Sequence, residues 1–222
     1  MTDKKNLSLL EVKVWGDFAC FTRPDMKVER VSYSVMTPSA ARGILEAIMW
    51  KPEIRWEVRE IHILKEIRHF SILRNEINNK AVVSTAKAWA NGKDEHYFAE
   101  EDRAQRHTLA LRDVAYLIKA ELLLKPHATD DIAKYREMFR RRVSKGQSFH
   151  QPCLGCREFP AWFGPVAETD QALGFSTDLG RMLFDLKYES GKSGRGQPRF
   201  FQGRIENGVL RIPAELYREV NA

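Results

Sequence analysis

The residues whose types and spacing could do chemistry are concentrated between Asp130 and Trp162. Asp130 to Lys145 contains six Lys or Arg residues and three acidic ones. At about 100° per residue, a helix here would gather its apolar side chains on one side and its cations on the other. The apolar stripe is Ile132, Tyr135, Phe139 and Val143; the cations are Lys134, Arg141 and Lys145, flanked by Arg140 and Arg142. Such a helix packs on a sheet and presents a basic ridge to water or to a polyanion.

A glycine-containing loop follows this basic helix. Gly146 stands just past the last lysine, where helices commonly end. The loop QSFHQPCLGCR, residues 147–157, then supplies amides, a hydroxyl and Gly155. Such residues let a phosphodiester approach the backbone amides closely. The alternative is an ordinary surface turn beside a solvated helix.

The chain has three cysteines. Cys153 and Cys156 form one C-x-x-C, with His150 just before it, and Cys20 is the only other thiol. A structural zinc site needs four ligands, and no second pair is present. We therefore expect reduced thiols in a loop, with no metal and no other cofactor.

Composition sets the broad class. A chain of 222 residues with 43% hydrophobic and 30% charged residues suits one or two globular domains. A net charge of +6 favours an acidic partner without choosing between nucleic acid, membrane surface and protein. The N-terminus has no apolar leader, and no run reaches membrane-spanning length. The sequence predicts a soluble, cytoplasmic protein with no membrane partner.

The sequence of the N-terminal third of the chain predicts a strand, a loop and a helix. Residues 10–14 alternate as a half-buried strand. Residues 16–35 read as a long loop that interleaves Arg23, Lys27 and Arg30 with Phe18, Phe21 and Tyr33. These side chains could pair phosphates and stack bases, or the aromatics could pin an ordered loop to the core. Thr37-Pro38 then starts a helix that Pro52 should end at about Lys51.

The remaining pattern completes a β-α-β-β-α-β succession over residues 1–166. Residues 54–63 predict a strand with a bulge near Arg59-Glu60. Residues 68–107 read as an insertion or mobile lobe. A strand over 109–124, with Arg112-Asp113 as a point of division, leads to the basic helix and an aromatic strand over 158–166. This order predicts an α+β, ferredoxin-like (RRM-like) domain.

Residues 167–222 predict a β-rich C-terminal extension. Residues 182–188 alternate as a strand, and 190–196 read as a flexible, cationic loop. Asn207-Gly208 predicts a hairpin turn between two further strands.

Three runs of sequence carry a family resemblance: VWGDFACFTRPDMKVERVSYSVMTPSAARGILEAIMWKP, KYREMFRRRVSKGQSF and QPCLGCREFPAWF. Together they resemble the type I-C (Dvulg) CRISPR-associated crRNA-processing endonucleases, the fifth-numbered Cas family, subtype d, of the RAMP superfamily. The likeness covers nearly the whole chain and is densest in residues 12–52 and 134–163. It implies a ferredoxin-like domain with a β-rich extension. It also implies metal-free cleavage of the CRISPR repeat transcript, and retention of the 5′ handle in a surveillance complex with backbone and large subunits.

The same resemblance indicates catalytic positions, two of which are altered. Family members place an aromatic residue or histidine before the Trp-Lys-Pro of the first helix, where this chain has Met49. They place Lys-His at the start of the second helix, where it has Lys134-Tyr135. Metal-free cleavage needs a proton acceptor, a proton donor and a cation near the phosphorane. Lys134 can be the cation and Tyr135, with a pKa near 10, the donor. The base must then be His150 or another histidine, or the rate falls about 10²–10⁴-fold.

Three functions follow as hypotheses. The first is a repeat-specific endoribonuclease, and the second a scaffold subunit that binds the handle and no longer cuts. The third is a non-specific nucleic-acid binder, including of duplex DNA. The expected RNA contacts are Arg23, Lys27, Arg30, Tyr33, Arg140, Arg141, Arg142 and Lys145, with backbone access at Gly146 and Gly155.

Overall fold

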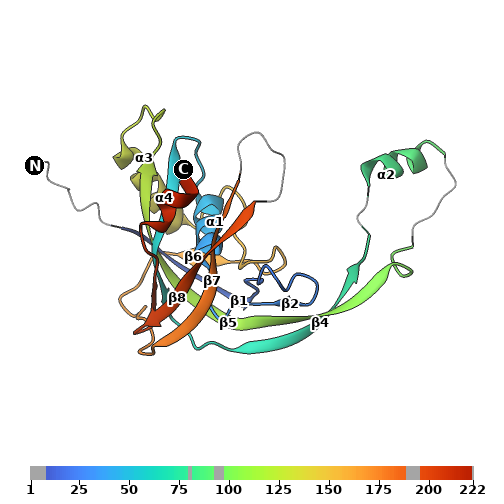
Figure 1. Cartoon of the computed structure of the whole chain (residues 1–222). Coiled ribbons are helices and arrows are strands. Elements are labelled where there is room, and N and C mark those ends of the chain that lie inside the picture. The colour runs from blue at the N-terminus through green and yellow to red at the C-terminus, as the bar shows by residue number, and fades with distance from the viewer. Residues whose placement is uncertain (1–8, 80–81, 93–97, 189–195, 222) are drawn as a thin grey trace, which may run out of the picture.

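The computed structural model describes residues 9–79, 82–92, 98–188 and 196–221. This part of the chain is a mixed α/β structure dominated by one curled, mainly antiparallel sheet (Figure 1). Its strands follow the order β6-β1-β5-β3-β9-β8-β7, and β2 and β4 also pair with β5. The central strands are β1 (Leu10–Ala19), β3 (Ile54–Ile63), β5 (Arg103–Leu124) and β6 (Trp162–Gly164).

Two helices cover this central part of the sheet. α1 (Pro38–Ile48) precedes β3, and α3 (Ile132–Lys145) connects β5 to β6. The predicted start of α1 and the predicted end of α3 are confirmed: Thr37 accepts a hydrogen bond from the Ala40 amide, and Gly146 has φ 62°. The helices contact each other, and the Trp56 ring of β3 lies 4.7 Å from the Phe139 ring of α3. The hydrophobic core therefore lies between this helical layer and the sheet.

Several predicted boundaries were wrong. β1 runs on to Ala19, so the following loop is shorter than expected and contains the two-residue strand β2 (Arg30–Val31). α1 ends at Ile48, before Lys51, because side chains from other elements bind its final carbonyl groups. The aromatic strand shrinks to Trp162–Gly164. The bulge is confirmed, since the register of β3 shifts between Val58 and Glu60.

The described residues within 68–107, which the sequence predicts to be an insertion or mobile lobe, form an arm. β4 (His69–Ile77) pairs with the first half of β5, and α2 (Val83–Ala90) lies at the tip, away from the rest of the molecule (Figure 1). No residue of β4 or α2 is buried, so neither carries the apolar periodicity that reveals an element. β5 is not divided at Arg112-Asp113. Asp113 instead has φ 53°, in the interval where pairing along one edge of β5 passes from β4 to β3.

The C-terminal strands extend the same sheet. β7 (Thr177–Lys187) pairs with β8 (Gln197–Glu206), β8 with β9 (Val209–Arg211), and β9 with β3. The hairpin turn is confirmed, with positive φ at Asn207 and Gly208. α4 (Leu216–Asn221) is tied to β3 because the Tyr217 hydroxyl accepts a hydrogen bond from the Val58 amide and donates one to its carbonyl. The predicted loop over 190–196 lies outside the described residues, except for Gly196. None of the described helices is long and apolar enough to span a bilayer.

Candidate active site and nucleic-acid interface

Lys134 and Tyr135 lie at the start of α3 and share one carboxylate. The Lys134 ammonium donates to Asp130 Oδ2 over 2.7 Å, and the Tyr135 hydroxyl donates to the same oxygen over 3.4 Å. The Lys134 side chain is 55% exposed, whereas the Tyr135 residue is only 2% exposed. The hydrogen bond to Asp130 raises the pKa of Lys134, and burial raises the pKa of Tyr135. At neutral pH the site therefore presents a charged, accessible ammonium beside a protonated phenol.

Glu53, in the turn between α1 and β3, faces the same cluster and was missed by the sequence reasoning. The charge of Glu53 raises the pKa of Tyr135, and only burial has a larger effect on that pKa. The same charge raises the pKa of Lys134, by less than Asp130 does. Its Oε2 atom is buried and has no hydrogen-bond partner among the described residues. The one available signal was its position directly after the Trp-Lys-Pro run at residues 50–52.

Two hydrogen bonds hold the Glu53 turn against the loop that precedes α3. The Lys125 amide donates to the Glu53 carbonyl oxygen over 2.8 Å. His127 Nε2 donates to the Pro52 carbonyl oxygen over 3.1 Å. The turn after α1 and the turn before α3 thus form one unit, which fixes Glu53 next to the start of α3.

Met49, the altered family position, is fully buried. Its carbonyl oxygen accepts a hydrogen bond from Trp56 Nε1 over 3.1 Å. The neighbouring Trp50 is 52% exposed. In this chain position 49 is therefore part of the core.

His150 is not brought to Lys134. Its amide donates to the Ala47 carbonyl oxygen of α1, and its exposed ring contacts Phe149 at 4.3 Å. Next to Ala47, the carbonyl oxygen of Ile48 binds Arg142, which lies eight residues beyond Lys134 on α3. At 1.5 Å per residue this is about 12 Å along the helix axis. The histidine expected to act as base thus lies toward the far end of α3.

The cations of α3 divide into an exposed set and a structural set. Arg140, Arg141 and Lys145 are exposed on the outer side of the helix. Arg142 is half-buried and donates to the Ile48 carbonyl over 2.6 Å. Arg136 is buried, which the sequence reasoning missed, and burial lowers its pKa. The predicted basic ridge exists, but it is narrower than expected.

The C-x-x-C loop packs against the end of β1. Gly155 has φ 87°, and a Cβ atom there would lie 2.1 Å from the Cys20 carbonyl oxygen. Cys156 Sγ lies 3.5 Å from Arg30 Nη1. A hydrogen bond from the Cys20 thiol, aided by the Arg30 charge, lowers the pKa of Cys156 to about 6. In the part of the chain that the structure describes, no group of three or more His, Cys, Asp or Glu side chains is placed to hold a metal ion.

The loop after β1 is pinned by its own aromatic residues, the second of the two readings above. Tyr33 is buried, its hydroxyl accepts a hydrogen bond from the Leu183 amide, and Arg23 lies 4.9 Å over its ring. Arg30 pairs with Glu76 of the arm at 3.2 Å and with Glu158 at 3.5 Å. Neither Tyr33 nor Arg30 is therefore free to stack or pair with RNA as predicted, whereas Lys27 is exposed.

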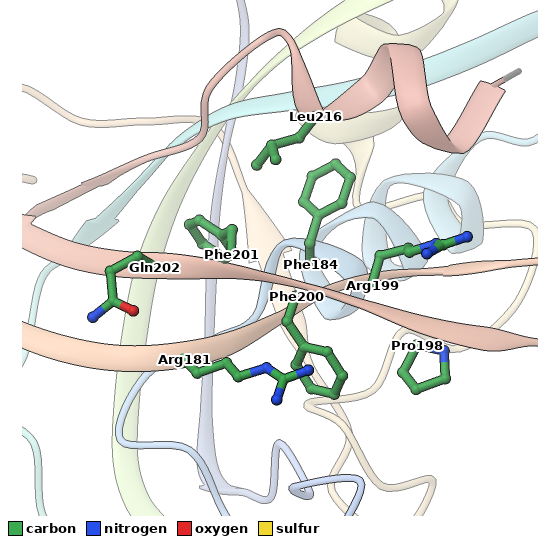
Figure 2. Close-up of a pocket in the computed structure, with 8 residues that line it drawn as sticks. All are labelled: Arg181, Phe184, Pro198, Arg199, Phe200, Phe201, Gln202 and Leu216. Carbon is green, nitrogen blue, oxygen red and sulfur yellow. The ribbon is translucent and has the colours of Figure 1, made fainter.

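Two adjoining hollows lie beside β7 and β8 and share Pro198. The first has a volume of about 440 Å³ and is lined by Arg23, Lys27 and the 64% exposed Tyr188, among others. The second, of about 430 Å³, is shown in Figure 2. There Arg181 lies 4.2 Å over the Phe200 ring. The two hollows thus bring cations next to one exposed ring, Tyr188, and one half-buried ring, Phe200, which are residue types used in single-strand binding.

Comparison with known proteins gives the family. The family model Cas_Cas5d, described as CRISPR-associated protein (Cas_Cas5), matches residues 9–213. The chain therefore belongs to this family of CRISPR-associated proteins.

Its relatives resemble it over nearly their whole length. A CRISPR pre-crRNA endoribonuclease Cas5d from Thermus thermophilus is 48% identical over 229 residues, covering 96% of this chain and 95% of the relative. A protein of the same name from Mannheimia succiniciproducens is 45% identical over 223 residues, covering 95% and 97%. A solved structure described as a CRISPR-associated protein superposes with a TM-score of 0.66 at 25% identity, over 94% of this chain and 93% of the other.

Proposed function

We propose that this protein is an endoribonuclease that cleaves the repeat of the CRISPR precursor transcript. The observation that carries the proposal is the pairing of an accessible Lys134 ammonium and a Tyr135 phenol on one Asp130 oxygen. The site lies at the helix start where the family resemblance expects catalytic groups. The two close relatives, both named pre-crRNA endoribonucleases, support the same reaction class.

The proposed reaction is attack by the 2′-hydroxyl on the adjacent phosphorus, without a metal. The O2′–P bond forms and the P–O5′ bond breaks, leaving a 2′,3′-cyclic phosphate and a 5′-hydroxyl. Lys134 stabilises the extra negative charge on the phosphorane oxygens. Tyr135 gives its proton to the departing 5′ oxygen and is reprotonated from solvent.

The scaffold for this site is, in our proposal, a ferredoxin-like unit. Its support is the strand order β6-β1-β5-β3, antiparallel at each step, with α1 before β3 and α3 between β5 and β6. The proposed division of the chain at residue 166 assigns β7, β8 and β9 to a C-terminal extension that continues this sheet through β9.

The test is cleavage of repeat RNA in excess EDTA. Wild-type protein should give a fragment with a cyclic phosphate, and Lys134→Ala should slow the reaction about 10²–10³-fold. Lys65→Ala is the matched control, because Lys65 is an exposed lysine that also pairs with one aspartate, Asp113. An uncut transcript, or equal rates for wild type and Lys134→Ala, would reject the proposal.

We also propose that the protein retains the 5′ handle as a subunit of the surveillance complex. The two hollows beside β7 and β8 support this role, because Lys27 and the exposed Tyr188 line one of them, and Arg181 and the half-buried Phe200 line the other. Lys27→Ala and Arg181→Ala should each weaken handle binding and reduce its salt dependence. Handle RNA that excess duplex DNA displaces would instead indicate a non-specific binder. Tight binding without any cleavage over hours would indicate a scaffold that no longer cuts.

A further inference from the structure

The proposed reaction lacks a proton acceptor. Family members have a titratable or aromatic group at position 49, where this chain has a buried methionine. Tyr135 has a raised pKa, which suits a donor and not a base. His150 lies toward the other end of α3. A base must therefore come from another side chain beside Lys134.

We infer that Glu53 is the general base that removes the proton from the attacking 2′-hydroxyl. The hydrogen bond from the Lys125 amide to the Glu53 carbonyl oxygen places the residue beside the loop that leads into α3, and its charge raises the pKa of both Lys134 and Tyr135. Hydrogen bonds from the loop before α3 fix the turn that carries it, which gives the carboxylate a defined position. The inference rests on the endoribonuclease function proposed above.

One carboxylate oxygen of Glu53 lacks a hydrogen-bond donor in the part of the chain that the structure describes. A buried carboxylate oxygen without a hydrogen bond is costly, and such atoms are rare in native structures. Among the described residues, none donates to the buried Oε2 of Glu53. The side chain is only half-buried as a whole, so it remains open to solvent on one side. A substrate hydroxyl approaching from that side would meet the open side of the carboxylate and not the buried Oε2.

The other nearby groups are less suited to the task. Asp130 already accepts hydrogen bonds from Lys134 and Tyr135, and the ion pair with Lys134 lowers its pKa, so it is a weak acceptor. His127 uses Nε2 to donate to the Pro52 carbonyl, which holds the ring against the turn but leaves Nδ1 as an acceptor. His127 is thus the main competitor and is included in the test.

Each proton in the assigned step has a source and a destination. The Glu53 carboxylate takes the 2′-hydroxyl proton as the O2′–P bond forms, and Tyr135 protonates O5′ as the P–O5′ bond breaks. Glu53 then returns its proton to water. No oxidant, reductant or metal takes part. Glu53 thus accepts one proton and Tyr135 donates another, while the Lys134 ammonium holds the phosphoryl oxygens.

The experiment separates base from donor by changing the leaving group. Repeat RNA is compared with the same RNA carrying sulfur in place of the bridging 5′ oxygen at the mapped cut site, because a thiolate leaves without protonation. Glu53→Gln should cleave both substrates about 10²–10⁴-fold more slowly than wild type. Tyr135→Phe should be slow on the oxygen substrate and close to wild type on the sulfur one. Glu168→Gln, an equal charge change at an exposed residue, is the control.

Binding and pH measurements complete the design. Glu53→Gln should bind a 2′-deoxy, uncleavable repeat as tightly as wild type, and the acid limb of the pH–rate profile should flatten. Glu53→Asp, which keeps the carboxylate but withdraws it by one methylene, should restore that limb with a reduced rate and provides a second variant if Glu53→Gln unfolds. Glu53 interacts electrostatically with Lys134 and Tyr135, which share Asp130, and His127 is bonded to the adjacent Pro52 carbonyl oxygen, so His127→Ala is profiled in parallel.

The outcomes distinguish the two proposals. If wild-type protein does not cut in EDTA, the function itself is wrong. If wild type cuts and Glu53→Gln cuts as fast, only the assignment of the base is wrong. If His127→Ala removes the acid limb while Glu53→Gln keeps it, the histidine is the base and this inference is overturned.

Discussion

The Arg142 guanidinium donates to the Ile48 carbonyl oxygen over 2.6 Å and joins the last turn of α3 to the last turn of α1. The bond satisfies one of the carbonyl groups that every helix leaves unpaired at its C-terminal end, and it places a cation at the negative end of the α1 dipole. Because the turn after α1 carries Glu53, this contact also sets the position of the candidate site.

Arg142→Ala should therefore lower stability more than it lowers RNA affinity. Loss of a charged hydrogen bond to a buried carbonyl is expected to reduce the free energy of unfolding by about 1.5–3 kcal/mol. Urea unfolding followed by far-UV circular dichroism measures this change. Arg141→Ala, on the exposed side of the same helix, should leave stability within about 0.5 kcal/mol and weaken RNA binding instead. The reverse pattern would place Arg142 in the RNA interface.

Substitutions at Met49 should affect folding before chemistry. Met49→Ala leaves a cavity in the core and should cost about 2–5 kcal/mol of unfolding free energy, whereas Met49→Leu keeps the volume and should cost less than about 1.5 kcal/mol. Met49→His buries a polar ring at a site with no exposed surface, so it should lower the melting temperature without accelerating cleavage. Faster cleavage by Met49→His would show that position 49 reaches the substrate.

Gly155→Ala should be strongly destabilising. A positive φ of 87° already disfavours any side chain, and the new Cβ would overlap the Cys20 carbonyl oxygen. We expect a loss of at least about 2 kcal/mol in unfolding free energy. Gly43→Ala is the matched control, because a Cβ at this helical glycine meets no atom within 4 Å and should stabilise by about 0.5–1 kcal/mol. Equal melting temperatures for the two variants would contradict the packing described here.

Stability should rise with pH between about 6 and 8 through Cys156. Its pKa is lowered to about 6 by the Cys20 thiol and Arg30, while an unfolded cysteine titrates near 8.5. The folded state therefore binds fewer protons than the unfolded state in this range. The stabilisation that Cys156 contributes is complete above the unfolded pKa and is lost as pH falls through about 6. The pKa of Cys20 is raised by the same pair, which opposes the trend only above the unfolded value.

Melting temperatures at pH 6, 7 and 8 in a reducing buffer measure this trend. Cys156→Ser should flatten it, and Cys153→Ser should keep it, because burial raises the pKa of Cys153 out of the range. Identical slopes in the two variants would assign the pH dependence to other groups.

Elements with strong local signals could be predicted from the sequence. The hydroxyl of Thr37 before Pro38, and Gly146 after the basic helix, mark helix ends by local chemistry that the tertiary structure does not override. The bulge in β3 was visible in the sequence because Ile61 and Ile63 stand at odd-numbered positions, whereas the apolar residues before them in the strand stand at even-numbered ones.

The arm and the site depended on contacts that no local pattern reports. β4 has no buried residue, and its half-buried face carries Phe70 and Ile72 but then Arg74 and Glu76, so the apolar alternation is short. Tyr33 and Arg30 have residue types suited to RNA, but their partners, Leu183 and Glu76, are distant in sequence. Glu53 was missed for the same reason: its neighbours Lys134 and Tyr135 follow some eighty residues later.

The continuity of β5 has a mechanical consequence. At about 3.3 Å per residue, its 22 residues form a strut of roughly 70 Å. One end is the exposed arm, and the other leads directly into the loop that carries His127 and Asp130. A partner that grips and bends the arm therefore pulls on the strand that fixes this loop, and the load passes through the kink at Asp113. The exposed arm and the loop before α3 are thus joined by a single continuous strand.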